Sequence, residues 1–233
     1  MRKKLVFGLL ALLSIGTLAG TLTGMAAPTA GMGLDWTALL SSGTSTTVPS
    51  PPPLSAASNV QAFYQGDASI GWDSSQQYQT WWPSACSPAA LTMVLKAWGA
   101  PVRIGQVLDR LIARQAITPE NGLLNANALA LVANDFGYQA MTFWRWSEQQ
   151  VAEVTAQGAP VMVDVVDTKR ETPYPGFVVG HWLTVVGVSA DHIDVRDSSG
   201  YHIKTLTPHV FHTLFKGIGV VVWQGASLKL PGK

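Results

Sequence analysis

Hydrophobic periodicity changes near Gly158, and this change constrains the fold more than any other feature of the sequence. Before that glycine, apolar residues recur at helical spacing, and after it they form short β-branched runs bounded by turn residues. A helical half followed by a strand-rich half is typical of α+β domains. We therefore expect N-terminal helices packed on a mostly antiparallel sheet.

Four helices are predicted in the first half. The clearest begins near Pro88 and ends at Gly99, and its apolar face repeats at i, i+3, i+4 and i+7. Three further segments have the pattern of helices: 104–112, 125–136 and 147–156. The last of these has Ser147 at its N-cap and Gln150 three residues later, the spacing of a capping box.

The second half predicts five strands. The runs 160–166 and 181–188 are almost entirely apolar and β-branched, which indicates central strands. The other predicted strands are 192–197, 201–206 and 218–223. Ser198-Ser199-Gly200 has the composition of a hairpin turn between two of them.

Residues 1–27 have the pattern of an export signal. Arg2, Lys3 and Lys4 precede an uncharged, largely apolar run, as in the basic and hydrophobic regions of a secretory signal. The run is also long enough to cross a bilayer if it is not cleaved, so an N-terminal anchor is the alternative. We expect a secreted or extracytoplasmic protein that meets a membrane only through this segment.

The stretch 28–59 is expected to be a linker, because it contains a tract rich in Ser, Thr and Pro that cannot bury much apolar surface. The folded domain should therefore span residues 60–230. That length is ample for a single hydrophobic core.

Composition excludes several classes of function. The chain of 233 residues has a net charge of +1 and no basic run beyond its N-terminus, so nucleic-acid binding is not expected. One cysteine excludes an intramolecular disulfide and multi-cysteine metal sites. Four of the five histidines have no carboxylate partners at metal-ligand spacing: His192, His202, His209 and His212. No cofactor and no metal are expected.

Cys86 is the first candidate for catalysis, because it directly precedes the predicted helix at Pro88. The free N–H groups and positive dipole end of a helix start stabilise a thiolate over a thiol. A buried, inert cysteine is the alternative. Exported proteins tend to exclude unpaired thiols, so a retained one at a helix start favours a chemical role.

His181 and Asp197 are the candidate partners of Cys86. His181 opens a central strand, so its imidazole should lie at the edge of the sheet, where it can meet a helix N-terminus. Asp197 ends the next strand and shares its parity with Ile193 and Val195. The start of one antiparallel strand lies beside the end of the next, so the carboxylate can orient the imidazole. This order of residues suits the triad of a thiol protease.

Three segments of the chain resemble the papain-like bacteriocin-processing peptidases, which cleave double-glycine leaders, and their standalone extracytoplasmic relatives. These segments are Gln79-x6-Cys86-Ser-Pro-Ala-Ala-Leu-Thr-Met-Val-Leu…Trp-Gly, Gly180-His181-Trp-Leu-Thr-Val-Val-Gly-Val and Val195-Arg196-Asp197. The likeness spans residues 79–223. It implies a papain-like fold with the nucleophile at a helix start.

The resemblance also implies residue roles. Cys86 would be the nucleophile, His181 the general base and acid, and Asp197 the residue that orients His181. Gln79 would donate to the oxyanion beside the Cys86 backbone N–H. Two positions depart from the family pattern: Ser87 replaces the usual glycine, and the oxyanion glutamine usually lies one residue closer to the cysteine.

The implied function is an exported cysteine peptidase that hydrolyses peptide bonds through a thioester on Cys86, with a peptide or protein as substrate. One alternative is a catalytically silent binding module with the same fold. A second is a related Cys-His enzyme, such as an NlpC-type cell-wall amidase or an acyl transferase. The sequence gives no oligomeric state.

Overall fold

The computed structural model describes residues 56–166, 180–200, 202–225 and 228–232. The predicted signal and nearly all of the predicted linker lie outside these residues. The first described element, α2 (Ala56–Asn59), falls within the stretch predicted to be linker. Its Ala57 N–H donates to the carbonyl of Gly158 at 2.9 Å, which ties the start of the domain to the loop before the central strands.

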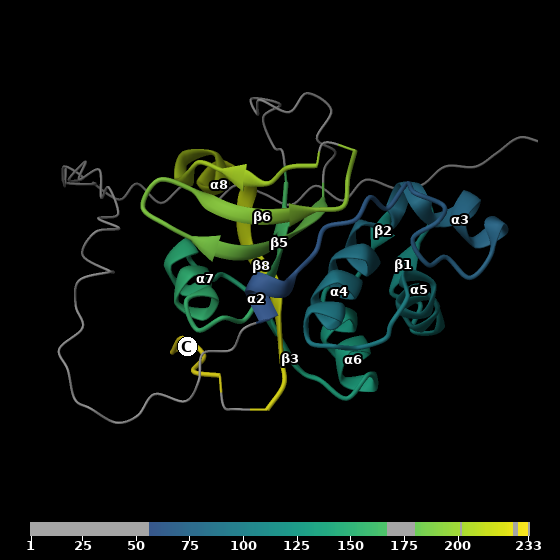
Figure 1. The fold of residues 1–233 in the computed structure, drawn as a ribbon, viewed down its shortest axis with the longest axis horizontal. Coiled ribbons are helices and arrows are strands. Elements are labelled where there is room, and N and C mark those ends of the chain that lie inside the picture. Colours follow the sequence, from purple (N-terminus) through teal and green to yellow (C-terminus); the bar gives the residue numbers. More distant parts are fainter. Residues whose placement is uncertain (1–55, 167–179, 201, 226–227, 233) are drawn as a thin grey trace, which may run out of the picture. The chain divides into compact units, whose positions relative to one another are not determined.

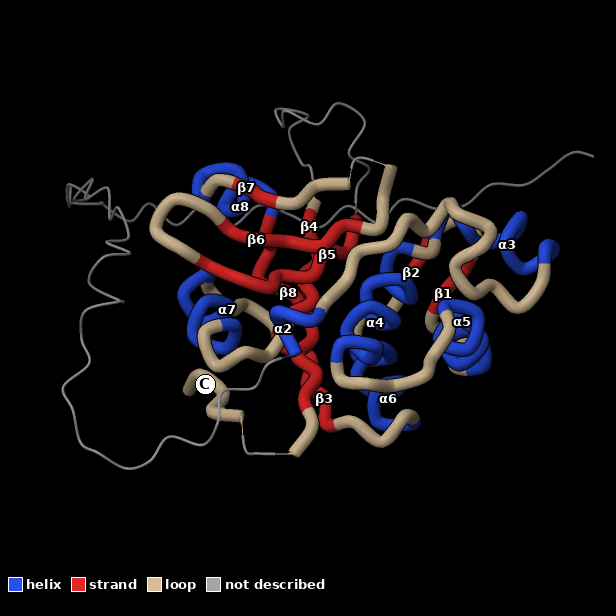
Figure 2. Tube along the Cα trace, viewed as in Figure 1, coloured by secondary structure: helices blue, strands red, loops and turns tan. Residues whose placement is uncertain are grey.

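The main sheet has six strands in the order β3-β8-β4-β5-β6-β7, and every pair in it is antiparallel. Its strands are β3 (Gln139–Phe143), β4 (Val161–Val165), β5 (His181–Val188), β6 (Ile193–Asp197), β7 (Thr205–Leu206) and β8 (Phe215–Trp223). A separate antiparallel pair is formed by β1 (Ile117–Thr118) and β2 (Gly122–Leu123). Figure 2 shows how the strands of the main sheet cross the domain between groups of helices.

Helices cover the two faces of the main sheet. After α2, the described chain forms the helices α3 (Ser75–Trp81), α4 (Cys86–Ala97), α5 (Ile104–Ala113), α6 (Asn127–Asp135), α7 (Glu148–Thr155) and α8 (Pro208–Leu214), and the 3-10 segment η1 (Trp82–Ser84). Helices α4, α5 and α6 share one buried core with Met162 and Trp182 of the sheet. Helices α7 and α8 share the other core with Val163 and Leu183. Figure 1 shows these groups on either side of the strands.

The two cores follow from strand alternation, because successive residues of a strand point to opposite faces. In β4, Val161, Val163 and Val165 belong to the core under α7 and α8, whereas Met162 belongs to the core under α4. Asp164 continues the parity of Met162 and therefore points toward the α4 side.

The α+β prediction is confirmed, and all four predicted helices form. The capping box is present in α7: Ser147 Oγ accepts from the Gln150 N–H at 3.3 Å, and Gln150 Oε1 accepts from the Ser147 N–H at 2.9 Å. The strand β5 has the predicted bounds, His181–Val188. Among the described residues, no helix combines the length and the hydrophobicity needed to span a membrane.

Two strand predictions need correction. The segment 201–206 was predicted to be a strand after a turn at 198–200; residue 201 lies outside the described residues, and of residues 202–206 only Thr205–Leu206 forms a strand. The backbone N–H groups of Ser199 and Ile203 donate to the Asp197 carboxylate, so this segment wraps around a side chain. The last strand begins at Phe215, three residues before the predicted start, directly after α8.

Candidate active site

Cys86 is the first residue of α4, where the first-turn N–H groups have no partner within the helix. The N-cap residue is Ala85, which has no side-chain acceptor to cap those groups. Cys86 is a free thiol and is partly exposed. A negative charge on its sulfur would therefore lie at the positive end of a twelve-residue helix.

His181 connects Cys86 to Asp197. Its Nε2 lies 2.7 Å from Asp197 Oδ1, and its ring is close enough to Cys86 for the sulfur to raise the pKa of the imidazole. Since Nε2 is engaged by the carboxylate, Nδ1 is the ring nitrogen left for the sulfur. The structure thus brings together three of the residues predicted from the sequence, in the order Cys86, His181 and Asp197.

The register of β5 and β6 produces this contact. Leu183 pairs with Asp197, so the carboxylate lies two residues along β5 from His181 and on the same face of the sheet. The histidine begins β5 directly after Gly180, whose φ of 79° lies in the left-handed region that glycine adopts without strain. His181 is 9% exposed, so the imidazole is close to the surface but mostly removed from water.

The Asp197 carboxylate is buried and accepts four hydrogen bonds from residues that the structure describes. Oδ1 accepts from His181 and from the Ser199 N–H at 2.8 Å. Oδ2 accepts from Ser199 Oγ at 2.6 Å and from the Ile203 N–H at 3.1 Å. This network fixes the carboxylate in one orientation, which in turn fixes the plane of the imidazole.

The electrostatics of the pair favour an ionised carboxylate and a protonated imidazole. Burial by itself lowers the pKa of His181, but the hydrogen bonds and charges of Asp197 and Cys86 outweigh it and raise the pKa to about 10. Burial by itself raises the pKa of Asp197, but His181 and Ser199 outweigh it and hold the pKa below its usual value. At neutral pH the ring is therefore an imidazolium, suited to stabilising a thiolate.

Cys86 and His181 line a cavity of about 470 Å³. One wall comes from the β1–β2 turn, where Glu120 and Asn121 lie, and the Ser84 hydroxyl just before Cys86 donates to the carbonyl of Pro119 in that turn. The volume is within the usual range for ligand sites, ~300–1,000 Å³.

Gln79 does not lie in this cavity. It is exposed on α3 and is not among the residues that line the cavity. The prediction relied on distance along the chain to Cys86, but α3 and the η1 turn carry Gln79 away from the sulfur. The structure therefore gives no support to Gln79 as the oxyanion donor.

Gln65, which the sequence analysis missed, lines the cavity and is only 7% exposed. Its Nε2 donates to the Trp82 carbonyl at 2.9 Å, and its Oε1 accepts from Ser198 Oγ at 2.8 Å. These bonds set the orientation of the amide, and within the described structure they use only one of the two Nε2 hydrogens. The one available sequence signal was a glutamine at the end of the apolar stretch Ala62-Phe63-Tyr64, far upstream of Cys86.

Ser87, the other departure from the family pattern, lies inside α4 and is fully buried. A helical position has negative φ, which any L residue adopts, so no left-handed conformation requires glycine here. The serine is therefore compatible with the backbone at the nucleophile.

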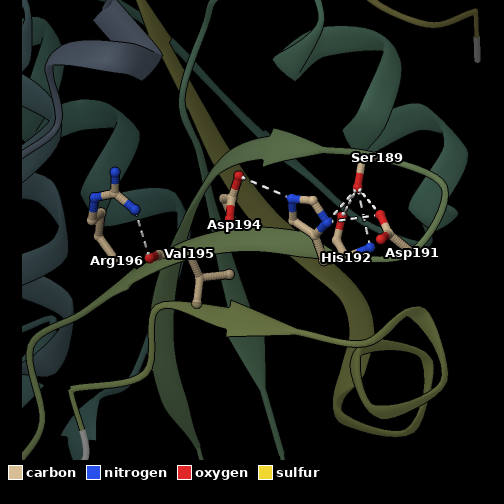
Figure 3. Close-up of polar contacts among 6 residues, drawn as sticks. All are labelled: Ser189, Asp191, His192, Asp194, Val195 and Arg196. Atoms are coloured by element: carbon tan, nitrogen blue, oxygen red, sulfur yellow. Dashed lines mark hydrogen bonds and ion pairs between the residues drawn. The ribbon is translucent and has the colours of Figure 1, made fainter.

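The other four histidines lie outside the cavity. His192 is held at the β5–β6 turn between Ser189 and Asp191 on one ring nitrogen and Asp194 on the other, as Figure 3 shows. His212 contacts Glu148 at 2.7 Å. In the part of the chain that the structure describes, no cluster of three His, Cys, Asp or Glu side chains has the arrangement of a metal site.

Comparisons with known proteins identify the family and the fold. The profile of the Peptidase_C39 like family matches residues 59–223. No curated protein matches the chain. Several solved structures, including the following two, are similar at low sequence identity, which bears on the fold alone.

The first is the peptidase domain of Streptococcus ComA, a bifunctional ABC transporter of a quorum-sensing pathway. It has a TM-score of 0.50 and 17% identity, over 61% of this chain and 93% of that domain. The second, a C39-like peptidase from Bacillus anthracis, has a TM-score of 0.51 and 13% identity, over 76% of this chain and all of that one. The chain has the papain-like fold of these peptidase domains, and it belongs to the Peptidase_C39 like family.

Proposed function

We propose that the protein is an exported cysteine peptidase that hydrolyses peptide bonds through a thioester on Cys86. The observation that carries the proposal is the line of side chains Cys86, His181 and Asp197, in which Asp197 is hydrogen-bonded to His181 and Cys86 lies at a helix start and lines a cavity with His181. This arrangement supplies a nucleophile, a proton carrier and an orienting carboxylate in one place.

The first half of the reaction forms the thioester. The Cys86 thiolate attacks the carbonyl carbon of the substrate, and the electron pair of the C=O bond moves to oxygen. The His181 imidazolium then protonates the leaving amine as the C–N bond breaks. The amine departs and the acyl group remains on sulfur.

The second half regenerates the enzyme. His181, now neutral, takes a proton from a water molecule as its oxygen attacks the thioester carbonyl. The C–S bond breaks, the carboxylic acid leaves, and Cys86 and His181 return to the thiolate–imidazolium pair. Asp197 keeps the imidazole in the orientation that both halves need.

Gln65 is the oxyanion donor in this proposal, with the backbone N–H of Cys86 as the second donor. Its amide is buried, its orientation is fixed by Trp82 and Ser198, and it lines the same cavity as the sulfur. A donor that is fixed before the reaction stabilises the developing oxyanion without reorganisation.

A peptide library tests the proposal. Purified protein is incubated with the library, and products are identified by mass spectrometry in parallel with Cys86→Ala. Cleavage by the wild type and none by the variant is the expected result. Release of muropeptides without peptide cleavage would replace peptidase by cell-wall amidase, and intact substrates of both kinds would support the binding module. Mass analysis of the secreted chain shows whether an N-terminal signal is removed.

A further inference from the structure

Asp164 is an acidic residue in the cavity that the proposed mechanism does not use. It lies in the otherwise apolar strand β4, pairs with Trp182 of β5, and precedes Val165, which pairs with His181. Its side chain points to the α4 side of the sheet and lines the same cavity as Cys86. Asp164 therefore lies in the cavity of the proposed catalytic residues but has no role in the proposed Cys86, His181 and Asp197 triad.

The carboxylate lacks a partner for one of its oxygens. Asp164 Oδ1 is buried and accepts no hydrogen bond from any residue that the structure describes. Burial raises the pKa of Asp164 to about 6, against the opposing effect of the positive charge on His181. At neutral pH the group is mostly ionised, and an ionised, partly desolvated carboxylate strongly favours a cationic partner.

His181 is not available as the hydrogen-bond partner of Asp164. Asp197 engages Nε2, and Cys86 engages the other side of the ring. The imidazole is thus already engaged by Asp197 and lies beside Cys86 in the resting site. Asp164 contributes only a longer-range charge to the imidazolium, so within the described structure its carboxylate has no direct cationic partner.

The rest of the cavity also suits a cation with an apolar stem. Its second carboxylate is Glu120 on the β1–β2 turn, and none of its described lining residues is a lysine or an arginine. The cavity is also lined by Leu124 and Trp144, large side chains that are 55% and 53% exposed. Such side chains can cover the aliphatic stem of a long basic residue while the charged end reaches Asp164.

We propose that Asp164 is a specificity-determining residue that binds the side chain of a lysine or arginine beside the scissile bond of the substrate. This inference rests on the proposed peptidase function. It names a substrate class, namely peptides with a basic residue adjacent to the cleaved bond.

The test compares two peptides that differ only in having lysine or glutamine beside the cleavage site. For the wild type, we expect kcat/KM to favour lysine by about tenfold to a hundredfold, the usual effect of a hydrogen bond to a charged group. Asp164→Asn keeps the shape of the side chain and should bring the ratio close to one. Asp191→Asn, on the β5–β6 turn outside the cavity and with its side chain 85% exposed, is the control and should change the ratio by less than about threefold.

The ratio of the two peptides separates specificity from positioning. If Asp164 acted only by orienting His181, Asp164→Asn would slow both peptides equally and leave the ratio unchanged, which would overturn the proposal. Equal rates for lysine and glutamine in the wild type would overturn it as well, and the peptidase function would then stand without it.

A second measurement does not depend on peptide cleavage. Cys86 is modified with 2-aminoethyl methanethiosulfonate, which is cationic, and with methyl methanethiosulfonate, which is neutral. The ratio of cationic to neutral rate should fall about fivefold in Asp164→Asn, the effect of removing one nearby charge. If no peptide is cleaved but this ratio falls, the cation site stands and the peptidase function fails. An unchanged ratio overturns the cation site.

Discussion

Replacing Asp197 by asparagine should destabilise the protein as well as slow it. Four donors from the described residues converge on this carboxylate: the His181 ring, the Ser199 N–H, the Ser199 hydroxyl and the Ile203 N–H. An asparagine has one acceptor oxygen, so its NH₂ group must face two of these donors. The substitution is therefore not conservative at this position.

The magnitude follows from the least costly orientation of the amide. With NH₂ in the place of Oδ2, the Ser199 hydroxyl can turn and become an acceptor, but the Ile203 N–H cannot. Ile203 is buried, so its unsatisfied N–H costs about 1–3 kcal/mol. Loss of the charge weakens the bond to His181 by about 1 kcal/mol more. We expect a loss of about 2–4 kcal/mol in the free energy of unfolding at pH 7.

Urea unfolding of the wild type and Asp197→Asn measures this difference. Asp194→Asn is the control, because Asp194 lies on the same strand with its side chain 41% exposed and only a 3.6 Å contact to His192. It should change the free energy of unfolding by less than about 0.5 kcal/mol. If Asp197→Asn changed the free energy of unfolding no more than Asp194→Asn does, the reasoning would be refuted.

The pH dependence provides a second check on the same variant. Folding lowers the pKa of Asp197 below 3.8, so its stabilisation is complete above that pH and is lost as the pH falls through the folded value. The difference in unfolding free energy between wild type and Asp197→Asn should therefore be smaller below about pH 4 than it is at pH 5. If this difference in unfolding free energy did not change on acidification, the charge of the Asp197 carboxylate would make no contribution to it.

Three further predictions concern the cavity. Cys86→Ala should abolish peptide cleavage with an unchanged melting curve, and His181→Ala should be nearly as severe because nothing else protonates the leaving amine; assays of purified variants check both. Gln65→Ala should lower kcat by about a hundredfold, whereas Gln79→Ala should leave it unchanged, and the reverse result would restore Gln79 to the site. The pKa of Asp164 is about 6 in the folded protein and 3.8 for an unburied carboxyl. The protonated side chain therefore favours folding below pH 3.8, and this contribution is lost as the pH rises through about 6. Between pH 4 and pH 8, the free energy of unfolding of Asp164→Asn should therefore rise by about 1–2 kcal/mol relative to that of the wild type, after discounting for solvent screening. Thermal unfolding at both pH values measures this change, and the absence of a relative rise would contradict the assigned burial of Asp164.

Local patterns predicted the elements that carry their own signals. The helix α4 has an apolar stripe and a glycine stop, and the strand β5 is a long β-branched run, so both are defined by nearby residues. The segment α3 has no buried residue, and so it offered no periodicity to detect. The strand β3, Gln139–Phe143, contains few strong strand formers, and its pairing with β8 stabilises it.

Strand parity also placed two members of the candidate site. His181 and Asp197 were expected to be neighbours because one begins a strand and the other ends the next, and the register of Leu183 with Asp197 brings this about. Gln65 was not predictable in this way. It reaches the site because its backbone N–H and its Oε1 are bonded to Ser198, a contact between distant parts of the chain.

The hydrogen bonds to the Asp197 carboxylate were also not predictable from the sequence. The segment after Asp197 looked like a tight turn and a strand, since Ser-Ser-Gly is a common turn sequence. The carboxylate instead accepts hydrogen bonds from the N–H groups of Ser199 and Ile203, and the next strand begins at Thr205. A buried charge thus determines the local backbone, and only the tertiary structure reveals that the charge is buried.

Labelling of Cys86 by an epoxide inhibitor of papain-like enzymes tests the central claim most directly. The protein and His181→Ala are treated under the same conditions, and intact mass is followed with time. We predict one inhibitor molecule per wild-type chain, attached at Cys86, and labelling at least about a hundredfold slower in His181→Ala. Equal rates in the two proteins, or no labelling of the wild type, would contradict the claim that His181 activates Cys86 as a nucleophile.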